Sequence, residues 1–340
     1  MLVLLVGGLE AAALFHGIRP RRDTPHTLRA SSAIRVAAVA VMAAGIAAPL
    51  VRRRLCLPPP AVTVTAAAAP FALCVAVRRS FARDVGTCVL QMWAYIATYQ
   101  MPNDDPERLL ARVHVDYPVT VDEVLGLGTS PTLRLQRLSD PERFARGEKV
   151  LVWAHWLWFF VPHSSLVYIR LRRPEAFPRA AALTYAVFDL GVLLYWALPT
   201  APPWYAAQHG RLAPDPEREE LVQVRRMMVE YGEQFWKDGW QPLYSFLGGN
   251  PLAAMPSLHF ATSVMAAQLL AETGPVGGAV GWAYALTLGI ALVYLGEHYV
   301  VDLLAGAALT QAVRRGATTI APALRAVSRA VTALEARAHA

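Results

Sequence analysis

Two histidines and one aspartate stand at the ends of apolar stretches in the last third of the chain. His259 lies in "AAMPSLHFATSVM" (253–265), and His298 and Asp302 lie in "GEHYVVDLLAG" (296–306). Side chains four residues apart share one face of a helix, so the carboxylate of Asp302 can bond one imidazole nitrogen of His298. Such a bond fixes the tautomer and strengthens the other nitrogen as a nucleophile. Because ionisable side chains are costly inside a membrane segment, their presence there indicates a functional site.

His259 offers the acid and the base that such a nucleophile needs. A second imidazole opposite the first can protonate a departing oxygen and later take the proton of an acceptor hydroxyl. Backbone N–H groups near Ser257 and Leu258 face the mouth of the predicted helix, where an anion such as phosphate is favoured. Together these groups suit the transfer of a phosphoryl group through a phosphohistidine.

Two other interpretations of the histidines stand beside this one. A histidine near a membrane interface is usually a polar residue that tolerates the headgroup zone, and its role is then structural. Two histidines and an aspartate can also bind zinc, but these motifs contain no tight ligand pair such as His-x-x-x-His. We therefore expect neither a metal nor a cofactor.

The elements that position these residues are membrane helices. Of the 340 residues, 55% are hydrophobic and 17% are charged, and the mean hydropathy is +0.33. This balance is typical of a polytopic membrane protein rather than a soluble domain. About 20 apolar residues cross the hydrocarbon core as a helix. We predict an all-α transmembrane bundle whose spans cover residues 1–18, 33–51, 59–77, 86–103, 150–170, 180–198, 256–272, 277–295 and 299–313.

Changes in composition divide the chain into four regions. Residues 1–80 hold N-terminal spans, and residues 81–149 hold one span followed by a polar, amphipathic segment at the membrane surface. Residues 150–316 form the predicted catalytic transmembrane core. Residues 317–340 form an amphipathic tail.

Arginine clusters give the orientation of the spans. The formal net charge is +7, but the arginines lie between apolar segments rather than in one patch, which indicates topology-setting residues and no nucleic-acid partner. Those at 170–179 and 314–315 belong on the cytoplasmic side. His259 and His298 then fall on the extracytoplasmic face of what we expect to be a bacterial cell membrane. The run "RRRL" at 52–55 falls outside and disagrees with this scheme.

The two motifs resemble those of a known family. "MPSLHFA" followed by "YLGEHYVVDLLAG" is similar to the paired histidine motifs of the type 2 phosphatidic acid phosphatase superfamily. That family characteristically has Pro-Ser-Gly-His, then a Ser-Arg-bearing motif that ends in His with Asp four residues on. This chain has Leu258 in place of the glycine, and Ala291 and Leu292 in place of Ser-Arg. These departures and "LPTAPPWYA" look closer to the inositol phosphorylceramide synthase branch, the inositolphosphotransferases, as does the polar stretch 117–138. The resemblance covers roughly residues 85–313.

The resemblance implies a six-helix core with extra N-terminal spans. It also implies His298 as nucleophile, Asp302 as its orienting carboxylate and His259 as general acid and base, which agrees with the spacing. The family's phosphate-clamping arginine has no counterpart here, and positive charge near a phosphoryl group is a major source of stabilisation. Besides the helix start near Ser257, the candidates for that charge are Arg211, Arg225, Arg226 and Lys237.

Further residues around the motifs are candidates for contact with substrate. "PTAPPW" (199–204) directly follows a span, where it ends the helix and forms a stiff edge of the site. His155 and His163 belong either to an aromatic interface segment or to a polar stripe that faces the substrate groove. The predicted substrate-binding residues are Ser257, Pro256, Tyr299, Trp204, Tyr205, Asn250 and Arg211.

These patterns predict an integral membrane lipid phosphotransferase. It would move a phosphoryl or phosphoinositol-type headgroup from a lipid phosphate or phospholipid donor to an alcohol or glycolipid acceptor. An alternative with the same residues is a lipid or polyprenyl (pyro)phosphate phosphatase that uses water as acceptor. A third alternative is a non-catalytic membrane transporter or scaffold. The complete set of two histidines and one aspartate and the absence of an internal repeat count against it.

Overall fold

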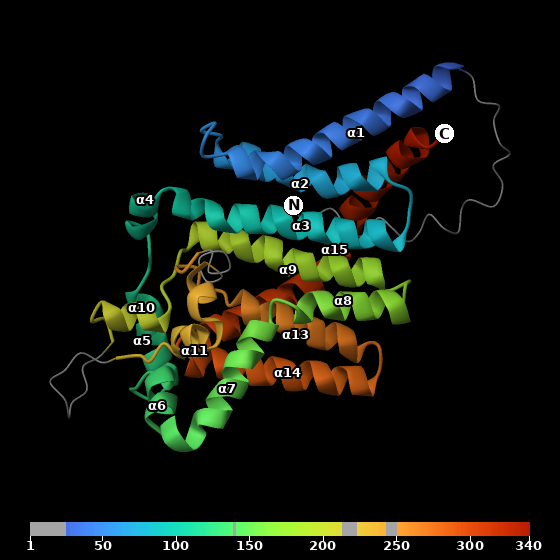
Figure 1. The fold of residues 1–340 in the computed structure, drawn as a ribbon. Coiled ribbons are helices and arrows are strands. Elements are labelled where there is room, and N and C mark those ends of the chain that lie inside the picture. The colour runs from blue at the N-terminus through green and yellow to red at the C-terminus, as the bar shows by residue number, and fades with distance from the viewer. Residues whose placement is uncertain (1–24, 139–140, 213–222, 243–249) are drawn as a thin grey trace. The chain divides into compact units, whose positions relative to one another are not determined.

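The structure, a computed structural model, describes residues 25–138, 141–212, 223–242 and 250–340, and these residues are predominantly helical (Figure 1). Isolated β-bridges pair His114 with Thr200 and Thr200 with Ala253. The predicted all-α class is confirmed. The chain forms two compact units, which are described in turn.

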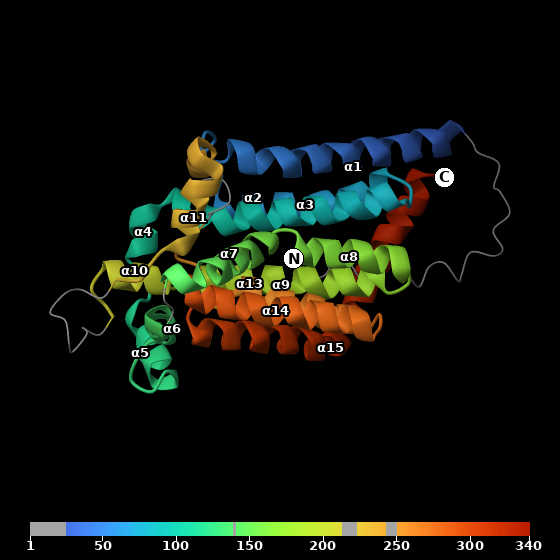
Figure 2. The same ribbon diagram turned by 60° about the horizontal axis from the view of Figure 1, so that its bottom comes forward.

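The first unit contains residues 25–104, 174–189 and 314–340 of the described chain. Its elements are α1 (Pro25–Val51), α2 (Pro59–Ala76), α3 (Phe81–Gln100), the 3₁₀ turn η3 (Met101–Asp104), the beginning of α9 (Phe177–Ala197) and the end of α15 (Val300–Ala338). Helices α1, α2 and α3 pack side by side (Figures 1 and 2).

Small and paired side chains hold the first unit together. A Cβ atom on Gly45 of α1 would lie 2.7 Å from the Cβ of Ala69 on α2, so the two backbones approach as closely as glycine allows. Arg52 and Arg53 belong to the run at 52–55 that was predicted to lie on the extracytoplasmic side, against the pattern of the other arginines. They form ion pairs with Asp104 at 2.7 and 2.6 Å. These arginines therefore fasten the end of α1 to the end of the α3 segment.

The second unit contains residues 105–173 and 190–313, apart from the gaps stated above. Besides the remaining parts of α9 and α15, its elements are α4 (Pro106–Leu110), α5 (Asp116–Leu125), α6 (Pro131–Leu138), α7 (Pro141–Leu157), α8 (Val161–Arg172), α10 (Pro203–Gln208), α11 (Met227–Trp236), the turn η4 (Lys237–Gly239), α13 (Leu258–Ala271) and α14 (Pro275–Tyr294).

Glycines set the contacts of α13. A Cβ on Gly281 of α14 would lie 2.7 Å from the Cα of Ala267, and one on Gly306 of α15 would lie 2.5 Å from the carbonyl oxygen of Ser257. The hydroxyl of Thr310 on α15 also donates to the carbonyl of Ala261 at 2.8 Å. Helix α13 is thus held closely against both α14 and α15.

Within the described residues, four helices are long and apolar enough to cross a membrane: residues 30–51, 59–76, 177–197 and 275–294. Residues 145–157 and 161–172 together form a fifth candidate that is bent by 61°. The predicted span at 150–170 thus corresponds to two helices joined at a bend. The chain breaks there because Pro162, in the first turn of α8, has no backbone N–H to continue α7.

Three other predicted spans differ from the helices observed. The span at 86–103 forms α3, which starts at Phe81 and carries the charged Arg83 and Asp84 in its first turn, so it is not among the apolar candidates. The span at 256–272 is the shorter, 14-residue α13. The span at 299–313 continues unbroken to Ala338, so the predicted tail belongs to the same helix. The predicted span 1–18 lies outside the described residues.

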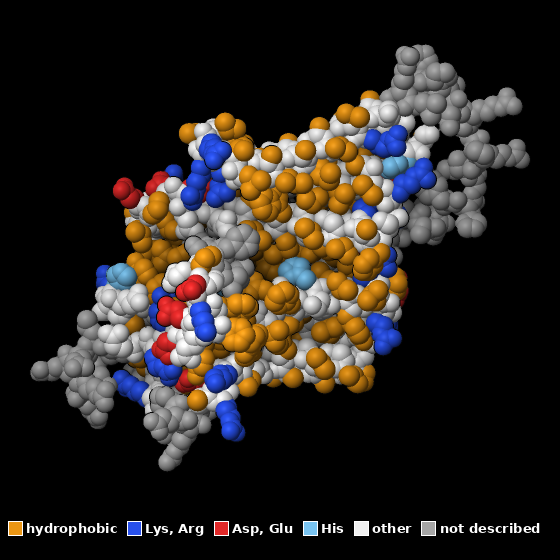
Figure 3. All heavy atoms as spheres, in the orientation of Figure 1, with side chains coloured by type: hydrophobic (Ala, Val, Ile, Leu, Met, Phe, Trp, Pro, Cys, Tyr) orange, Lys and Arg blue, Asp and Glu red, His pale blue; other side chains and the backbone are white. Residues whose placement is uncertain are grey.

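The surface of each unit carries large exposed apolar side chains on its helices. Val36, Leu50 and Val64 are 69%, 67% and 69% exposed, and Leu193 and Ile290 are 59% and 58% exposed. On the face drawn in Figure 3, hydrophobic side chains cover the lengths of the helices and charged side chains gather near their ends. Such apolar helix surfaces are stable against lipid. The protein is an integral membrane protein.

Candidate active site

The structure brings the two histidines and the aspartate into one continuous chain of contacts. Nδ1 of His259 lies 3.2 Å from Nε2 of His298, and Nδ1 of His298 lies 3.3 Å from Oδ2 of Asp302. Asp302 is fully buried, His298 is 4% exposed, and His259 is partly exposed. Within this series of contacts, the carboxylate of Asp302 therefore lies at the buried end, and the imidazole of His259 lies at the end nearest the surface.

The beginning of α13 places His259. Ser257 is the N-cap, and its hydroxyl accepts a hydrogen bond from the N–H of Phe260 at 3.3 Å. The N–H of Ser257 donates to the carbonyl of Asp302 at 2.9 Å. That bond joins the first histidine motif directly to the second, so the two helix starts have a fixed separation.

The backbone N–H groups that were predicted to bind an anion at this helix start already have hydrogen-bond partners within the protein. Besides the bonds of Ser257 and Phe260, the N–H of Leu258 donates to the hydroxyl of Tyr195 at 3.3 Å. The same hydroxyl donates to the carbonyl of Pro256 at 2.9 Å. Protein groups therefore satisfy the N–H groups of Ser257 and Leu258 that the sequence offered to phosphate.

Leu258 occupies the position at which the related motifs have glycine, and a glycine elsewhere makes room for it. A Cβ atom on Gly191 of α9 would lie 2.3 Å from the side chain of Leu258. Leu258 itself is only 2% exposed. The side chain at position 258 on α13 is therefore accommodated by the lack of a side chain at position 191 on α9.

The beginning of α15 places His298 and Asp302. Oδ2 of Asp302 accepts the N–H of Tyr299 at 2.9 Å, and Oδ1 of Asp122 on α5 accepts the N–H of Val301 at 3.2 Å. Asp122 is fully buried. Burial raises the pKa of Asp122 to about 6, although bonds from the backbone of α15 oppose the shift. Sequence reasoning missed this residue, but its neighbourhood in 117–138 already resembled the polar stretch of the related branch.

Two further side chains contact His259, one from the last turn of α7 and one from the bend that follows it. The ring of Trp158 lies 4.1 Å, centroid to centroid, from the ring of His259, and the ring of His155 lies 4.8 Å from it. The indole N–H of Trp158 donates to the hydroxyl of Thr262 at 2.9 Å, which fixes its plane. His155 therefore contacts the ring of His259 within a group of aromatic side chains.

Several predicted substrate-binding residues have structural partners. Tyr299 is fully buried in an apolar cluster with Val119 and Leu133. The side-chain oxygen of Asn250 accepts the N–H of Leu252 at 3.1 Å and closes the turn there. With the cap at Ser257, these residues shape the scaffold on which the histidines stand.

The predicted aromatic edge on α10 reaches the loop that carries His298. The backbone N–H of Trp204 donates to the carbonyl of Gly296 at 3.3 Å, and the guanidinium of Arg226 lies 3.9 Å above the Trp204 ring. Burial raises the pKa of Glu297, and the positive charge of Arg226 opposes that shift. Tyr205 stacks on His209, with ring centroids 3.9 Å apart.

Among the four candidate cations, Arg226 is the one whose interactions reach the His298 loop. Arg211 is exposed and pairs with Asp116 at 3.3 Å. Arg225 pairs with Glu148 at 2.8 Å and with Glu230 at 2.7 Å, which neutralises its charge. Lys237 is exposed. Within the described residues, no group of three His, Cys, Asp or Glu side chains has the geometry of a metal site.

Comparison with known proteins places this geometry in a family. The model of the PAP2 superfamily matches residues 120–314, more than half of the chain. The inositol phosphorylceramide synthase catalytic subunit of Schizosaccharomyces pombe is 31% identical over 130 residues, which cover 38% of this chain and 30% of the relative. Inositol phosphorylceramide synthase of Candida albicans is 28% identical over 165 residues, which cover 46% and 33%.

The chain spans about a third of the length of these two relatives. No solved structure matches the chain. The family match includes both histidine motifs, and the two relatives are of the branch that the motifs predicted. The chain belongs to the PAP2 (type 2 phosphatidic acid phosphatase) superfamily, in its inositolphosphotransferase-like branch.

Proposed function

We propose that the protein is an integral membrane lipid phosphotransferase that works through a phosphohistidine on His298. The observation that carries the proposal is the order of contacts Asp302–His298–His259, with 3.3 and 3.2 Å between the bonded atoms. Asp302 holds Nδ1 of His298, so Nε2 is the nitrogen with an electron pair to give. His259 stands on the side of Nε2, where the leaving group and the acceptor must arrive.

In the first half of the reaction, Nε2 of His298 attacks phosphorus. The bond between phosphorus and the oxygen of the donor lipid breaks, and His259 in its protonated form delivers a proton to that oxygen. The departing lipid alcohol leaves as a neutral molecule. The phosphoryl group, with any headgroup it carries, stays on His298. Asp302 stabilises the positive charge that develops on the ring of His298 as the N–P bond forms.

In the second half, an acceptor hydroxyl attacks the same phosphorus. His259, now neutral, takes the proton of that hydroxyl, the new P–O bond forms and the N–P bond breaks. His298 returns with its electron pair, and His259 is again protonated for the next turnover. Arg226, beside Trp204 and Glu297, is the cation proposed to balance phosphate charge during both halves.

The branch favours transfer to a lipid alcohol over transfer to water. Both relatives are named inositol phosphorylceramide synthases. By analogy, we propose that this protein transfers a phosphoinositol-type headgroup to a long-chain alcohol acceptor. The indole ring of Trp158, packed on the ring of His259, also gives this side of the site an apolar wall that suits a lipid acceptor. The arginine pattern supports a site on the extracytoplasmic face, and a bacterial source stays a prediction.

The test uses the full-length protein in lipid nanodiscs with a headgroup-labelled phosphatidylinositol and a ceramide or diacylglycerol acceptor. We expect a new labelled lipid from the wild type and a loss of at least about 1,000-fold in rate for His298→Ala and for His259→Ala, since both steps need both groups. His339→Ala, a histidine change in the last residues of the chain, is the matched control and should leave the rate unchanged. Equal rates in His298→Ala and wild type would disprove the mechanism, and release of free inositol phosphate without a new lipid would make the protein a hydrolase.

A further inference from the structure

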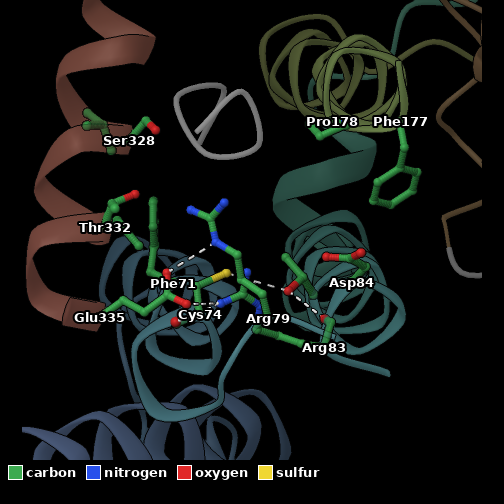
Figure 4. Close-up of a pocket in the computed structure, with 13 residues that line it drawn as sticks. Phe71, Cys74, Arg79, Arg83, Asp84, Phe177, Pro178, Ser328, Thr332 and Glu335 are labelled. Atoms are coloured by element: carbon green, nitrogen blue, oxygen red, sulfur yellow. Dashed lines mark hydrogen bonds and ion pairs between the residues drawn. The ribbon is translucent and has the colours of Figure 1, made fainter. Parts of the chain in front are cut away.

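Carboxylates outside the histidine site pair with arginines in both units. In the first unit, the carboxylate oxygens of Glu335 lie 2.7 and 3.6 Å from Nη1 of Arg83 and Nε of Arg79, beside a cavity (Figure 4). These charges neutralise one another and fasten the end of α15 to the start of α3. In the second unit, Glu148 of α7 pairs with Arg225 at 2.8 Å, and the residue that follows Arg225 is the cation proposed for the reaction.

The side chain of Glu148 is 1% exposed, and its two oxygens accept hydrogen bonds from three side chains. The guanidinium of Arg225 donates to both oxygens, at 2.8 and 3.2 Å. The hydroxyls of Tyr231 and Tyr294 donate at 2.9 Å each. A buried carboxylate holds such donors in a fixed geometry, because leaving its charge unpaired is costly. The side chain of Arg225 is therefore fixed relative to the end of α14, where Tyr294 is the last residue.

The amide of Gln136, on α6, binds the backbone of the same two residues. Its Nε2 donates to the carbonyl of Tyr294 at 2.7 Å and to the carbonyl of Arg225 at 3.2 Å. Its Oε1 accepts the N–H of Arg225 at 3.0 Å. Glu148 and Gln136 thus join Arg225 to Tyr294 twice, once through the side chains and once through the main chain. With both its backbone and its side chain bonded, Arg225 has little freedom to rotate or to shift.

Arg226 directly follows Arg225, and its guanidinium reaches the loop of His298. The guanidinium lies 3.9 Å above the ring of Trp204, and the backbone N–H of Trp204 donates to the carbonyl of Gly296 at 3.3 Å. A cation stabilises the charge of a phosphoryl transition state only from the right position, and a misplacement of about 1 Å can cost about 100-fold in rate. The groups that hold Arg225 therefore also set where the charge of Arg226 stands.

We propose that Gln136 and Glu148 are positioning residues of the transfer reaction and that they act through Arg226. The two side chains hold the segment of Arg226 against the end of α14, and the loop of His298 begins at the same helix end. The cation and the nucleophile are thereby placed relative to one common element. The catalytic part of this inference rests on the proposed function and on the role of Arg226 in it, whereas the placement of Arg226 can be measured without turnover.

The kinetic test is a double-mutant cycle on the full-length protein in nanodiscs with the labelled phosphatidylinositol donor. Gln136→Leu nearly keeps the size of the side chain but removes its three hydrogen bonds to Arg225 and Tyr294. We expect it to lower kcat about 10-fold with little change in KM, since the cation is then out of place in the transition state. In an Arg226→Gln background, which has no cation to misplace, Gln136→Leu should lower kcat by less than about 2-fold. Glu148→Gln should couple to Arg226→Gln in the same way, with a larger loss of stability because it removes a buried charge partner.

Two control variants separate positioning from a general loss of structure. Gln234→Leu makes the same change at an exposed position of α11 and should leave kcat unchanged. Thr132→Val removes a hydrogen bond of 3.0 Å from α6 to the end of α14 that involves no atom of Arg225. Its effect on kcat should be the same factor in the two backgrounds. An equal loss for Gln136→Leu with and without the cation would overturn the inference and leave the histidine mechanism intact.

A spectroscopic measurement follows the placement of Arg226 without turnover. The protein is made with fluorotryptophan, and the fluorine NMR resonance of Trp204 is assigned by its loss in Trp204→Phe. Arg226→Gln should shift this resonance, because it removes the cation over the ring. Gln136→Leu should shift it in the same direction, and Gln234→Leu should not. An unchanged Trp204 resonance in Gln136→Leu would overturn the positioning of Arg226, whatever reaction the protein catalyses.

Discussion

At the scale of single residues, the site depends on what surrounds each imidazole. Asp302 orients His298 from inside, and the rings of Trp158 and His155 flank His259 from the side of α7. His155 and Trp158 come from a segment about a hundred positions before His259 in the chain. We expect His155 to act as a positioning residue that keeps the His259 ring in line with His298.

Replacing His155 with Phe tests this role. Phenylalanine keeps an aromatic ring against His259 but removes the ring nitrogens, so the protein should fold and keep its affinity for substrate. We expect kcat to fall about 10-fold or more with little change in KM, because the lost interaction acts on the transition state rather than on binding. His163→Phe, from the next helix, is the control. If kcat is unchanged in His155→Phe, His155 only fills space.

The raised pKa of Asp122 leads us to expect that the free energy of unfolding depends on pH. Its pKa is raised to about 6, chiefly by burial, against about 3.9 in an unfolded chain. The folded state therefore holds the extra proton between these two values, and this group stabilises the fold fully below pH 4 and loses that contribution as the pH rises through 6. The upper bound is about 3 kcal/mol, from two pKa units at about 1.4 kcal/mol each.

The measurement is the midpoint of thermal unfolding from pH 4 to pH 8 for the wild type and for Asp122→Asn. The amide keeps an oxygen that accepts the N–H of Val301 but does not titrate. We expect the variant to lose the part of the pH dependence that lies between pH 4 and 6. An identical pH profile in the two proteins would show that Asp122 is not the group responsible.

At the scale of elements, the separation of the histidines is set by the contact of α13 with α15. Gly306 stands at this contact, and a Cβ there would lie 2.5 Å from the carbonyl oxygen of Ser257. The oxygen belongs to the backbone and has no room to move aside. A side chain at 306 must therefore push the start of α15, with Asp302, away from the start of α13.

Gly306→Ala should thus lower stability and abolish turnover together. Gly316→Ala lies on the same helix, and a Cβ there meets nothing within 4 Å, so it should be neutral or stabilising by up to about 1 kcal/mol through helix propensity. Unfolding midpoints and transferase rates for both variants make the comparison. A fully active Gly306→Ala protein would mean that the contact is not needed for the histidine pair.

At the scale of the whole molecule, the order of apolar and basic segments predicts the sides of the membrane. Positions after α9 should face the outside and positions after α8 the cytoplasm. In a chain with Cys56, Cys74 and Cys88 replaced by serine, we expect Arg211→Cys to react with a membrane-impermeant maleimide in intact cells. Arg173→Cys should react only after permeabilisation, because both side chains are exposed and the arginine pattern predicts that they face opposite sides of the membrane. The reverse pattern of labelling would place the histidines inside.

Much of the site was predictable because its signals are local. The four-residue spacing of His298 and Asp302 and the helix start near Ser257 are local properties of the sequence. What was missed depends on contacts between distant segments. The hydrogen bond from the N–H of Val301, at the start of α15, to Asp122 joins positions 179 residues apart. The spacing of apolar residues along the sequence gives no sign of such a bond. The bend at Pro162 and the close approach of Leu258 to Gly191 likewise need the tertiary structure.

The direct bond between His259 and His298 has a consequence for the resting protein. On the proposed mechanism Nε2 of His298 is the attacking atom, and the bond to His259 occupies that nitrogen. A donor phosphate must therefore take the place of that bond, with its oxygens facing the imidazole of His259 while phosphorus approaches Nε2. The contact that holds the two rings together thus becomes part of the free-energy cost of binding the donor.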